Sequence, residues 1–329
     1  MSPLLKDGFS RKISYLRLSV TDRCDFRCTY CMSEEMQFVP RQEILSLEEC
    51  LFVARVFVSM GVDKIRLTGG EPLVRKGFPW LAARIRELPG LRELTLTSNG
   101  SRLAGMAGLL KHAGIDRINL SLDTLDPELF KRLTRGADLS QVLAGLDAAI
   151  DAFGSRNIKL NTVMLRGVND QELPAMVEFA LERGVDISFI ERMPLGKTDD
   201  SQAGTFHSST EALESLRRQH ELLPSPESSG GPARYWRIPG RESRIGFISP
   251  HTHNFCADCN RMRVTARGEL YPCLGNEGVI DLLPAVRAGN ETALRGLVLQ
   301  AVVDKPKAHE FDMTQAEPCI VRFMSRTGG

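Results

Sequence analysis

Short aliphatic runs alternate with longer amphipathic runs along the first two thirds of the chain. The clearest amphipathic run begins at Ser46 with a capping box that Glu49 completes, and Gly61 ends it as a helix C-terminal residue. Repeated strand-then-helix units predict parallel strands joined by right-handed crossovers. Because six units are too few for a closed eight-stranded barrel, we expect an α/β fold, an open and partial (β/α)6 barrel. The predicted strands cover residues 14–20, 64–68, 93–97, 117–122, 158–164 and 186–190.

Polar side chains share one face in five of these predicted strands. In the first strand Arg17 and Ser19 alternate with leucines, so the two polar residues point the same way. Parallel strands are usually apolar on both faces. An edge strand or a solvated sheet face would explain one such strand, but five favour a cavity that holds a polar ligand. The other polar sets are Arg66 and Thr68; Thr95 and Thr97; Asn119, Ser121 and Asp123; and Lys159 and Asn161.

The pattern changes after residue 194. A polar loop leads to a capped helix over 208–221 and then to a segment rich in Pro, Ser and Gly over 224–232. Two hairpins are predicted, over 233–249 and 263–274. Two helices follow at about 280–289 and 291–303. We therefore expect two domains, a partial barrel over 1–195 and a C-terminal region over 196–329.

Composition narrows the class of protein. The 329 residues are 42% hydrophobic and 25% charged, with a formal net charge of +1, so charge indicates neither a nucleic-acid nor a membrane partner. No apolar stretch is long enough to span a bilayer, and the N-terminus lacks the apolar core of a secretory signal. Six of the eight cysteines fall in two tight groups, which favours metal chemistry in a reducing cytoplasm.

The first group is Cys24, Cys28 and Cys31, spaced C-x3-C-x2-C. Three thiolates can hold a [4Fe-4S] cluster whose fourth iron has no protein ligand, and that iron can bind a small molecule and pass it an electron. A partial zinc knuckle or a chance cluster of core cysteines is the alternative, but zinc sites normally use four ligands in paired C-x2-C units. The spacing, with Tyr30 before the last cysteine, resembles the signature of radical S-adenosylmethionine (SAM) enzymes.

The second group is Cys256, Cys259 and Cys273, spaced C-x2-C-x13-C. Spacing alone leaves two interpretations open. One is a zinc site completed by His251 or His253, and the other is a second open-site [4Fe-4S] cluster whose free iron binds a nitrogen or oxygen of a substrate. Cys319 is a candidate for an additional ligand, although a lone cysteine in a tail is more often incidental. We interpret Cys50, within the predicted first helix, as core packing.

Taken together, these motifs make the chain similar to the GTP 3′,8-cyclase family of radical SAM enzymes, which acts in molybdenum cofactor (molybdopterin) biosynthesis. Among radical SAM enzymes, the C-N-R-x-R-x-T element and the final Gly-Gly are specific to that family. The chain departs from it by placing His251 and His253 before the second triad, which keeps a mixed ligand set open, and by carrying Phe323 and Thr327 where Pro and often Ile are expected. The matching elements are C-D-F-R-C-T-Y-C, I-R-L-T-G-G-E-P-L, L-T-S-N-G, I-N-L-S-L-D-T-L, I-K-L-N-T-V, F-I-E-R-M-P and F-C-A-D-C-N-R-M-R-V-T.

The resemblance implies a role for particular residues. Both cysteine triads would hold [4Fe-4S] clusters, the first within a radical SAM barrel and the second in a C-terminal cluster-binding region. SAM would be contacted by Tyr30, Gly70, Ser121 and Met193. GTP would be contacted by Arg17, Arg66, Thr97, Lys159, Arg261 and Arg263. Catalytic roles would fall to Arg17, Gly328 and Gly329, because in the family the terminal glycines reach the active site and are needed for the GTP step.

Elementary electrostatics agrees with the resemblance. A triphosphate carries about four negative charges and needs several cations and N–H donors. Arg17, Arg66 and Lys159 fall on the polar inner phase and could converge on one cavity, although unrelated surface salt bridges are the alternative. Arg261 and Arg263 are two residues apart, so on a strand they would point the same way, towards the second triad.

The resemblance also implies a reaction and partners. The reaction is conversion of GTP to (8S)-3′,8-cyclo-7,8-dihydroguanosine 5′-triphosphate by a lyase. The partners are a flavodoxin- or ferredoxin-type electron donor and, downstream, cyclic pyranopterin monophosphate synthase; a homodimer is compatible with the sequence. One alternative is a radical SAM enzyme that modifies peptides or activates a glycyl radical enzyme, whose extra cluster domains usually carry more cysteines. A non-enzymatic zinc scaffold or nucleic-acid binder is another, which the absence of a basic stripe disfavours.

Overall fold

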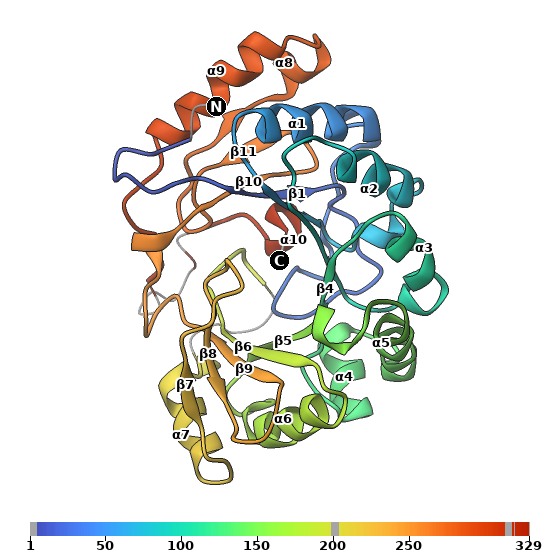
Figure 1. Ribbon diagram of the computed structural model, residues 1–329, viewed down its shortest axis with the longest axis vertical. Helices are drawn as coiled ribbons and strands as arrows, with labels where there is room; N and C mark the ends of the chain where they lie inside the picture. Colours follow the sequence, from blue (N-terminus) through green and yellow to red (C-terminus); the bar gives the residue numbers. More distant parts are fainter. Residues whose placement is uncertain (1–4, 199–203, 313–317, 319, 329) are drawn as a thin grey trace.

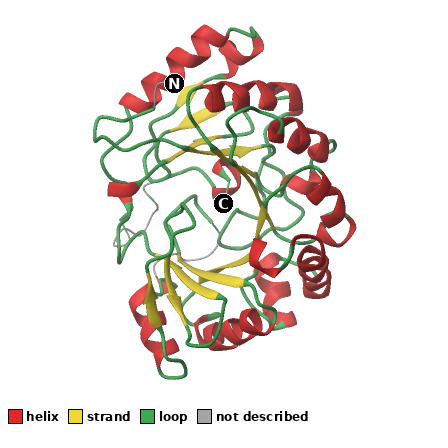
Figure 2. Cartoon of the chain, in the orientation of Figure 1, coloured by secondary structure: helices red, strands yellow, loops and turns green. Residues whose placement is uncertain are grey.

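The computed structural model describes residues 5–198, 204–312, 318 and 320–328. A single twelve-stranded sheet runs through it in the order β12-β11-β10-β1-β2-β3-β4-β5-β6-β9-β8-β7. The strands form one curved layer with most helices on its outer side (Figure 2). Helix α10, near the end of the chain, lies towards the middle of the curve (Figure 1).

The six predicted barrel strands are confirmed and are parallel, each hydrogen-bonded to the next in sequence order. They are β1 (Tyr15–Ser19), β2 (Lys64–Thr68), β3 (Glu93–Ser98), β4 (Arg117–Ser121), β5 (Ile158–Met164) and β6 (Asp186–Glu191). The helices between them are α1 (Leu47–Ser59), α2 (Phe78–Arg86), α3 (Ala107–His112), α4 (Pro127–Thr134), α5 (Leu139–Phe153) and α6 (Leu173–Glu182). This arrangement is the predicted partial barrel.

The C-terminal region supplies further strands to the same sheet. Both predicted hairpins are confirmed, one formed by β8 (Arg234–Arg237) with β9 (Arg244–Ile248), the other by β10 (Arg261–Val264) with β11 (Glu269–Tyr271). The sequence did not indicate that β10 would pair in parallel with β1 and β9 in parallel with β6. Because both parts of the chain contribute strands to one sheet, the division into two domains at residue 195 stays a prediction.

The remaining elements close the edges and ends of the sheet. Strands β7 (Leu223–Ser225) and β12 (Ile280–Asp281) are its two outermost strands. The helices here are α7 (Ser209–Arg217), α8 (Leu283–Arg287), α9 (Glu291–Val303) and α10 (Met324–Thr327). Helix α9 has the predicted bounds, and each end of α7 and α8 lies within four residues of its predicted position. Short 3-10 helices cover Arg41–Glu43, Pro72–Val74, Leu103–Gly105, Ser155–Asn157, Asp170–Glu172 and Cys256–Asp258.

The core lies between the sheet and its outer helices. Leu16 and Leu18 of β1 are fully buried, and the leucines and isoleucines at matching positions of β2 to β5 are buried with them. Helix α1 starts as predicted, because the Ser46 hydroxyl accepts a hydrogen bond from the Glu49 amide (3.1 Å) while the Glu49 carboxylate accepts one from the Ser46 amide (2.6 Å). Cys50 is fully buried in this core, as expected. In the described part of the chain, no helix has the length and apolar character needed to cross a membrane.

Candidate active site

A cavity of about 310 Å³ lies on the inner, polar face of the sheet. The predicted alternation thus does place polar side chains around a hollow. Both cysteine triads line this cavity, together with every predicted SAM and GTP position. These residues are Cys24, Cys28, Cys31, Cys256, Cys259 and Cys273; Tyr30, Gly70, Ser121 and Met193; and Arg17, Arg66, Thr97, Lys159, Arg261 and Arg263. Residues far apart in sequence therefore meet at one site.

The first triad sits on the loop that follows β1, and a glycine pair packs against that loop. Gly70 donates its amide hydrogen to the Thr21 carbonyl oxygen (2.9 Å). A β-carbon on Gly70 would lie 2.4 Å from the Arg23 carbonyl oxygen, and one on Gly69 would lie 2.4 Å from the Thr21 carbonyl oxygen. Since these contacts are with backbone, no side chain could move aside. The pair is glycine because the loop leading to Cys24 approaches too closely for any other residue.

The thiols of this triad perturb one another. Burial raises the pKa of Cys24, and the charges of Glu71, Cys31 and Asp25 raise it further. Burial likewise raises the pKa of Cys28, again with a contribution from Cys31, and raises that of Cys31 to about 12. Three such groups become thiolates together only beside a compensating positive charge, which a bound iron–sulfur cluster provides. The three residues therefore fit the ligand set expected from the sequence.

The predicted SAM positions collect at the same end of the sheet. Gly70 follows β2, Ser121 ends β4 and Met193 follows β6, and all three line the cavity. The Tyr30 hydroxyl donates to Asp123 Oδ2 (2.5 Å), whose other oxygen accepts from the Val163 amide (2.8 Å). Burial raises the pKa of Asp123 to about 6 despite these hydrogen bonds. The carboxyl ends of parallel strands are where α/β folds place ligands, and this arrangement follows that rule.

The second triad lies at the opposite, amino end of the strands. Cys256 starts a 3-10 helix, Cys259 lies just before β10, and Cys273 follows β11. The intervening Asn260 carbonyl accepts hydrogen bonds from the amides of Ser14 and Tyr15, both at 3.1 Å, which fixes this segment at the start of β1. Five residues of β1 span about 17 Å at roughly 3.3 Å per residue. The two triads thus face each other along the strands with room for a substrate between them.

The histidines considered as extra ligands are placed elsewhere. The His251 ring nitrogen Nε2 lies 3.1 Å from the Arg192 carbonyl oxygen, and its ring packs edge-on against Phe206. His253 is exposed, and neither histidine lines the cavity. His309, which sequence reasoning missed, does line it, with Nε2 2.9 Å from the Pro250 carbonyl oxygen. Cys319 lies outside the described residues.

The predicted substrate cations form one group between the triads. Arg17 is in direct register with Arg66 on one side and Arg263 on the other, so three guanidinium side chains share a row across neighbouring strands. Burial lowers the pKa of Arg17 to about 10, to which the charges of Arg66 and Arg261 contribute. Burial also lowers the pKa of Arg263, with Arg17 and Arg261 adding to the effect. An anion bound among these guanidinium groups would relieve their mutual repulsion.

Hydrogen bonds hold two of these cations in place. Arg66 Nη1 donates to Thr97 Oγ1 (3.1 Å) while its Nε donates to the Tyr15 hydroxyl (2.5 Å). Lys159 Nζ donates to the Tyr235 hydroxyl (3.0 Å), and burial lowers the pKa of Lys159. The predicted contact residues Arg66, Thr97 and Lys159 are therefore fixed on three different strands before any ligand is present.

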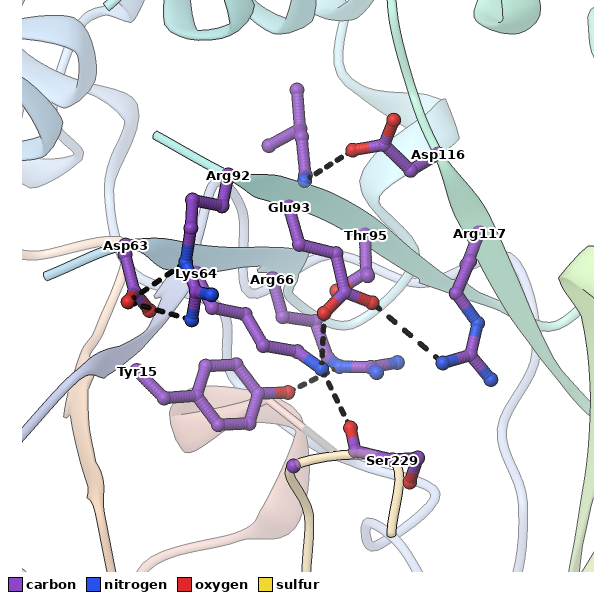
Figure 3. Close-up of polar contacts among 12 residues, drawn as sticks. Tyr15, Asp63, Lys64, Arg66, Arg92, Glu93, Thr95, Asp116, Arg117 and Ser229 are labelled. Atoms are coloured by element: carbon purple, nitrogen blue, oxygen red, sulfur yellow. Dashed lines mark hydrogen bonds and ion pairs between the residues drawn. The ribbon is translucent and has the colours of Figure 1, made fainter. Parts of the chain in front are cut away.

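Two cavity residues at the amino ends of β1 and β2 were missed by the sequence prediction (Figure 3). Lys64 Nζ lies 2.7 Å from Glu93 Oε2 and donates to the Ser229 carbonyl oxygen (3.0 Å). Burial alone would raise the pKa of Tyr15, but the charges of Arg66, Arg17 and Lys64 outweigh it and lower the pKa to about 7. Tyr15 lies two residues before Arg17, and Lys64 lies two residues before Arg66, so both point to the same polar face. The alternation of polar and aliphatic residues could therefore have identified them.

The end of the chain reaches this cation group. The Gly328 carbonyl oxygen accepts from Arg263 Nη1 (2.6 Å) and from Arg17 Nη2 (3.3 Å). Arg322 anchors the preceding segment, because it pairs with Glu277 (2.7 Å) and donates to the Cys273 carbonyl oxygen (3.3 Å). Gly328 therefore contacts two of the predicted substrate cations, its catalytic role stays a prediction, and Gly329 lies outside the described residues.

Comparisons with known proteins agree with this architecture. Residues 18–180 match the Radical SAM superfamily and residues 185–311 match Molybdenum Cofactor Synthesis C. The chain is 55% identical to a GTP 3′,8-cyclase of Pseudomonas putida strain GB-1, over 100% of this chain and 99% of that protein. It is 52% identical to a GTP 3′,8-cyclase of Marinobacter nauticus, over 99% of this chain and 98% of that one.

A solved structure shares the fold at low sequence identity. Streptococcus suis SuiB bound to S-adenosylmethionine aligns with 96% of this chain and 78% of its own, with a TM-score of 0.62 and 15% identity. At that identity the likeness concerns the arrangement of strands and helices alone.

Proposed function

Because the chain belongs to the GTP 3′,8-cyclase family of radical SAM enzymes, we propose that its cavity converts GTP to (8S)-3′,8-cyclo-7,8-dihydroguanosine 5′-triphosphate, the first step of molybdenum cofactor biosynthesis. One observation carries the proposal: two cysteine triads face each other across one cavity with a group of cations between them. The peptide-modifying and glycyl-radical-activating alternatives lack such support, since the two relatives described above, which match over nearly the full chain, are named as cyclases.

The residues fit the family's cofactors, two [4Fe-4S] clusters and SAM. Cys24, Cys28 and Cys31 would hold the cluster that binds SAM. The second triad would hold the other cluster at the guanine end of the substrate. When bound, these groups would supply the one-electron chemistry by which the C3′ hydrogen of GTP is removed and the ribose carbon bonds to C8 of guanine, with one further electron and a proton completing the dihydro product.

The chain's own residues bind, orient and enclose the substrate. In the proposal Arg17, Arg66 and Arg263 surround the triphosphate, where guanidinium forks make charge-assisted hydrogen bonds to phosphate oxygens. The Tyr30–Asp123 pair fixes the loop that carries the first triad next to the SAM positions. The tail segment ending at Gly328 covers the cation group, which limits the access of water to a radical reaction.

The test is anaerobic reconstitution followed by metal analysis and activity assays. We expect about eight irons per chain, SAM cleavage, and GTP-dependent formation of the cyclised nucleotide, identified by mass spectrometry. Cys24→Ala should abolish SAM cleavage, whereas Cys259→Ala should spare some cleavage but remove the GTP product. A preparation with about one zinc and at most four irons would show that the second triad is a zinc site and would overturn the proposal.

Substitution of the cations tests the pocket itself. Arg17→Ala, Arg261→Ala and Arg263→Ala should each lose GTP conversion while the first cluster stays intact, because each charge-assisted phosphate contact contributes about 1.5–3 kcal/mol. Arg84→Ala is a matched control, since Arg84 of the outer helix α2 is exposed and pairs with Glu87 just after that helix. Wild-type turnover by all three pocket variants would refute the assignment.

The proposal extends to partners and location. The electron for SAM cleavage would come from a flavodoxin- or ferredoxin-type donor, and the product would pass to a cyclic pyranopterin monophosphate synthase. We place these steps in the cytoplasm, where the cysteines stay reduced. We also propose a homodimer, which sedimentation of the reconstituted protein would test; a monomer at all concentrations would exclude it.

A further inference from the structure

Lys305 lies beside the second triad although no sequence motif pointed to it. It follows helix α9, and only 2% of its surface is exposed. Its ammonium donates hydrogen bonds to the Arg261 carbonyl oxygen (2.8 Å) and to the Pro272 carbonyl oxygen. Arg261 comes two residues after Cys259, and Pro272 directly precedes Cys273. One side chain therefore joins the two separate segments that carry these cysteines.

The charge of Lys305 points to an anion at the same place. Burial lowers the pKa of Lys305, and the negative charges of Cys259 and Cys273 oppose that shift. Two other buried cations near this triad have carboxylate partners, Arg11 with Asp7 and Arg322 with Glu277. Among the residues that the structure describes, no carboxylate forms an ion pair with Lys305. A buried charge without a counter-charge is costly, and the groups that can supply one here are the thiolates.

We propose that Lys305 is a positioning residue of the second cluster, whose ammonium compensates the thiolate charge of Cys259 and Cys273 and ties their two segments together. This inference rests on the proposed function, because it takes the second triad to hold an iron–sulfur cluster. Hydrogen bonds to the sulfurs and net charge set the reduction potential of such a cluster. A nearby cation stabilises the added electron, so Lys305 raises the midpoint potential of the second cluster.

A purely structural role makes a different prediction. If Lys305 only ties two carbonyl groups together, its replacement lowers stability or iron loading but leaves the potential of any loaded cluster unchanged. Lys305→Met removes charge and donors, Lys305→Gln keeps donors without charge, and Lys305→Arg keeps the charge. Lys307→Met is the matched control, since Lys307 is an exposed lysine two residues away.

The experiment is an EPR-monitored redox titration of the reconstituted full-length protein, with iron counted in each sample. Wild type with about eight irons tests the proposed function, so its failure is seen before any variant is compared. In Lys305→Met we expect one of two reduction waves to move to lower potential by at least about 59 mV, a tenfold change for one electron. Lys305→Gln should show the same shift, Lys305→Arg should restore most of it, and Lys307→Met should match wild type.

The remaining outcomes also decide the question. Unchanged reduction potentials in a fully loaded Lys305→Met or Lys305→Gln protein would overturn the inference. They would show that Lys305 only links the Arg261 and Pro272 carbonyl groups. If both neutral variants bind only about four irons while Lys305→Arg binds about eight, the charge is required and the inference stands. If Lys305→Arg also binds only about four irons, side-chain shape rather than charge decides loading and the inference fails.

Discussion

Gly328→Ala is the substitution that tests the docked tail most directly. Gly328 has φ 78° and ψ 113°, a backbone conformation that residues with a β-carbon rarely adopt. A β-carbon at this position would lie 2.3 Å from Thr68 Cγ2 and 2.9 Å from Thr68 Oγ1. Thr68 is 1% exposed on β2, so it has little room to move. Alanine therefore cannot occupy this place without displacing the tail.

The magnitude follows from the contacts that would be lost. Backbone strain of this kind costs about 1–3 kcal/mol. Displacement also weakens the hydrogen bonds that the Gly328 carbonyl accepts from Arg263 and Arg17, and hydrogen bonds to charged groups contribute about 1.5–3 kcal/mol each. Even a combined loss of about 2 kcal/mol lowers the equilibrium constant for docking of the C-terminal segment by about 30-fold.

The assay measures the cyclised nucleotide and 5′-deoxyadenosine in the same anaerobic reaction. We expect Gly328→Ala to keep both clusters and to cleave SAM, but to form the GTP product at least about 30 times more slowly. Adding Thr68→Ser, which removes the methyl group that the new β-carbon meets, should recover part of the rate.

The control separates strain from position. Gly289 also has positive φ (61°), but a β-carbon there would meet nothing within 4 Å. Gly289→Ala should therefore lower stability slightly and leave the GTP rate unchanged. A Gly328→Ala protein that forms product at the wild-type rate would show that the tail is only a frayed end.

Substitutions at other buried positions test further parts of the site. Cys50→Ala should leave iron content at about eight per chain, whereas Cys273→Ala should lower it to about four; equal iron in both would contradict the assignment. Gly70→Ala should impair SAM binding and first-cluster loading because its β-carbon would meet backbone, while Gly108→Ala, with nothing within 4 Å, should not. Tyr15→Phe removes a hydroxyl with a pKa of about 7. Between pH 7 and 10 the unfolded chain binds more protons at Tyr15 than the folded chain does, so the free energy of unfolding of wild type relative to the variant should grow by about 1 kcal/mol per pH unit. Chemical denaturation at several pH values measures this difference, and a difference that does not change with pH would refute the reasoning.

Local patterns were enough to predict most elements of the fold. Alternation of aliphatic and polar residues gave the six parallel strands, and the Ser46 capping box gave the start of α1, because strand and helix periodicity depend on near neighbours in sequence. The polar phase of β1, β2 and β5 correctly indicated a cavity on the inner face. The spacing of Cys24, Cys28 and Cys31 is a local property too, so the sequence predicted this triad without knowledge of the fold.

Long-range placement was decided only by the tertiary structure. The sequence predicted the hairpin that contains β10, but the parallel pairing of β10 with β1 brings Arg263 beside Arg17 and sets Cys259 at the amino end of the strands, opposite Cys24. No local pattern encodes that pairing, because it joins residues about 250 positions apart through backbone groups that every sequence carries. The position of Lys305 and the docking of Gly328 depend on it in the same way, since each contacts a residue of β10. Local periodicity fixed which side chains face inward, and packing of distant segments decided which of them meet.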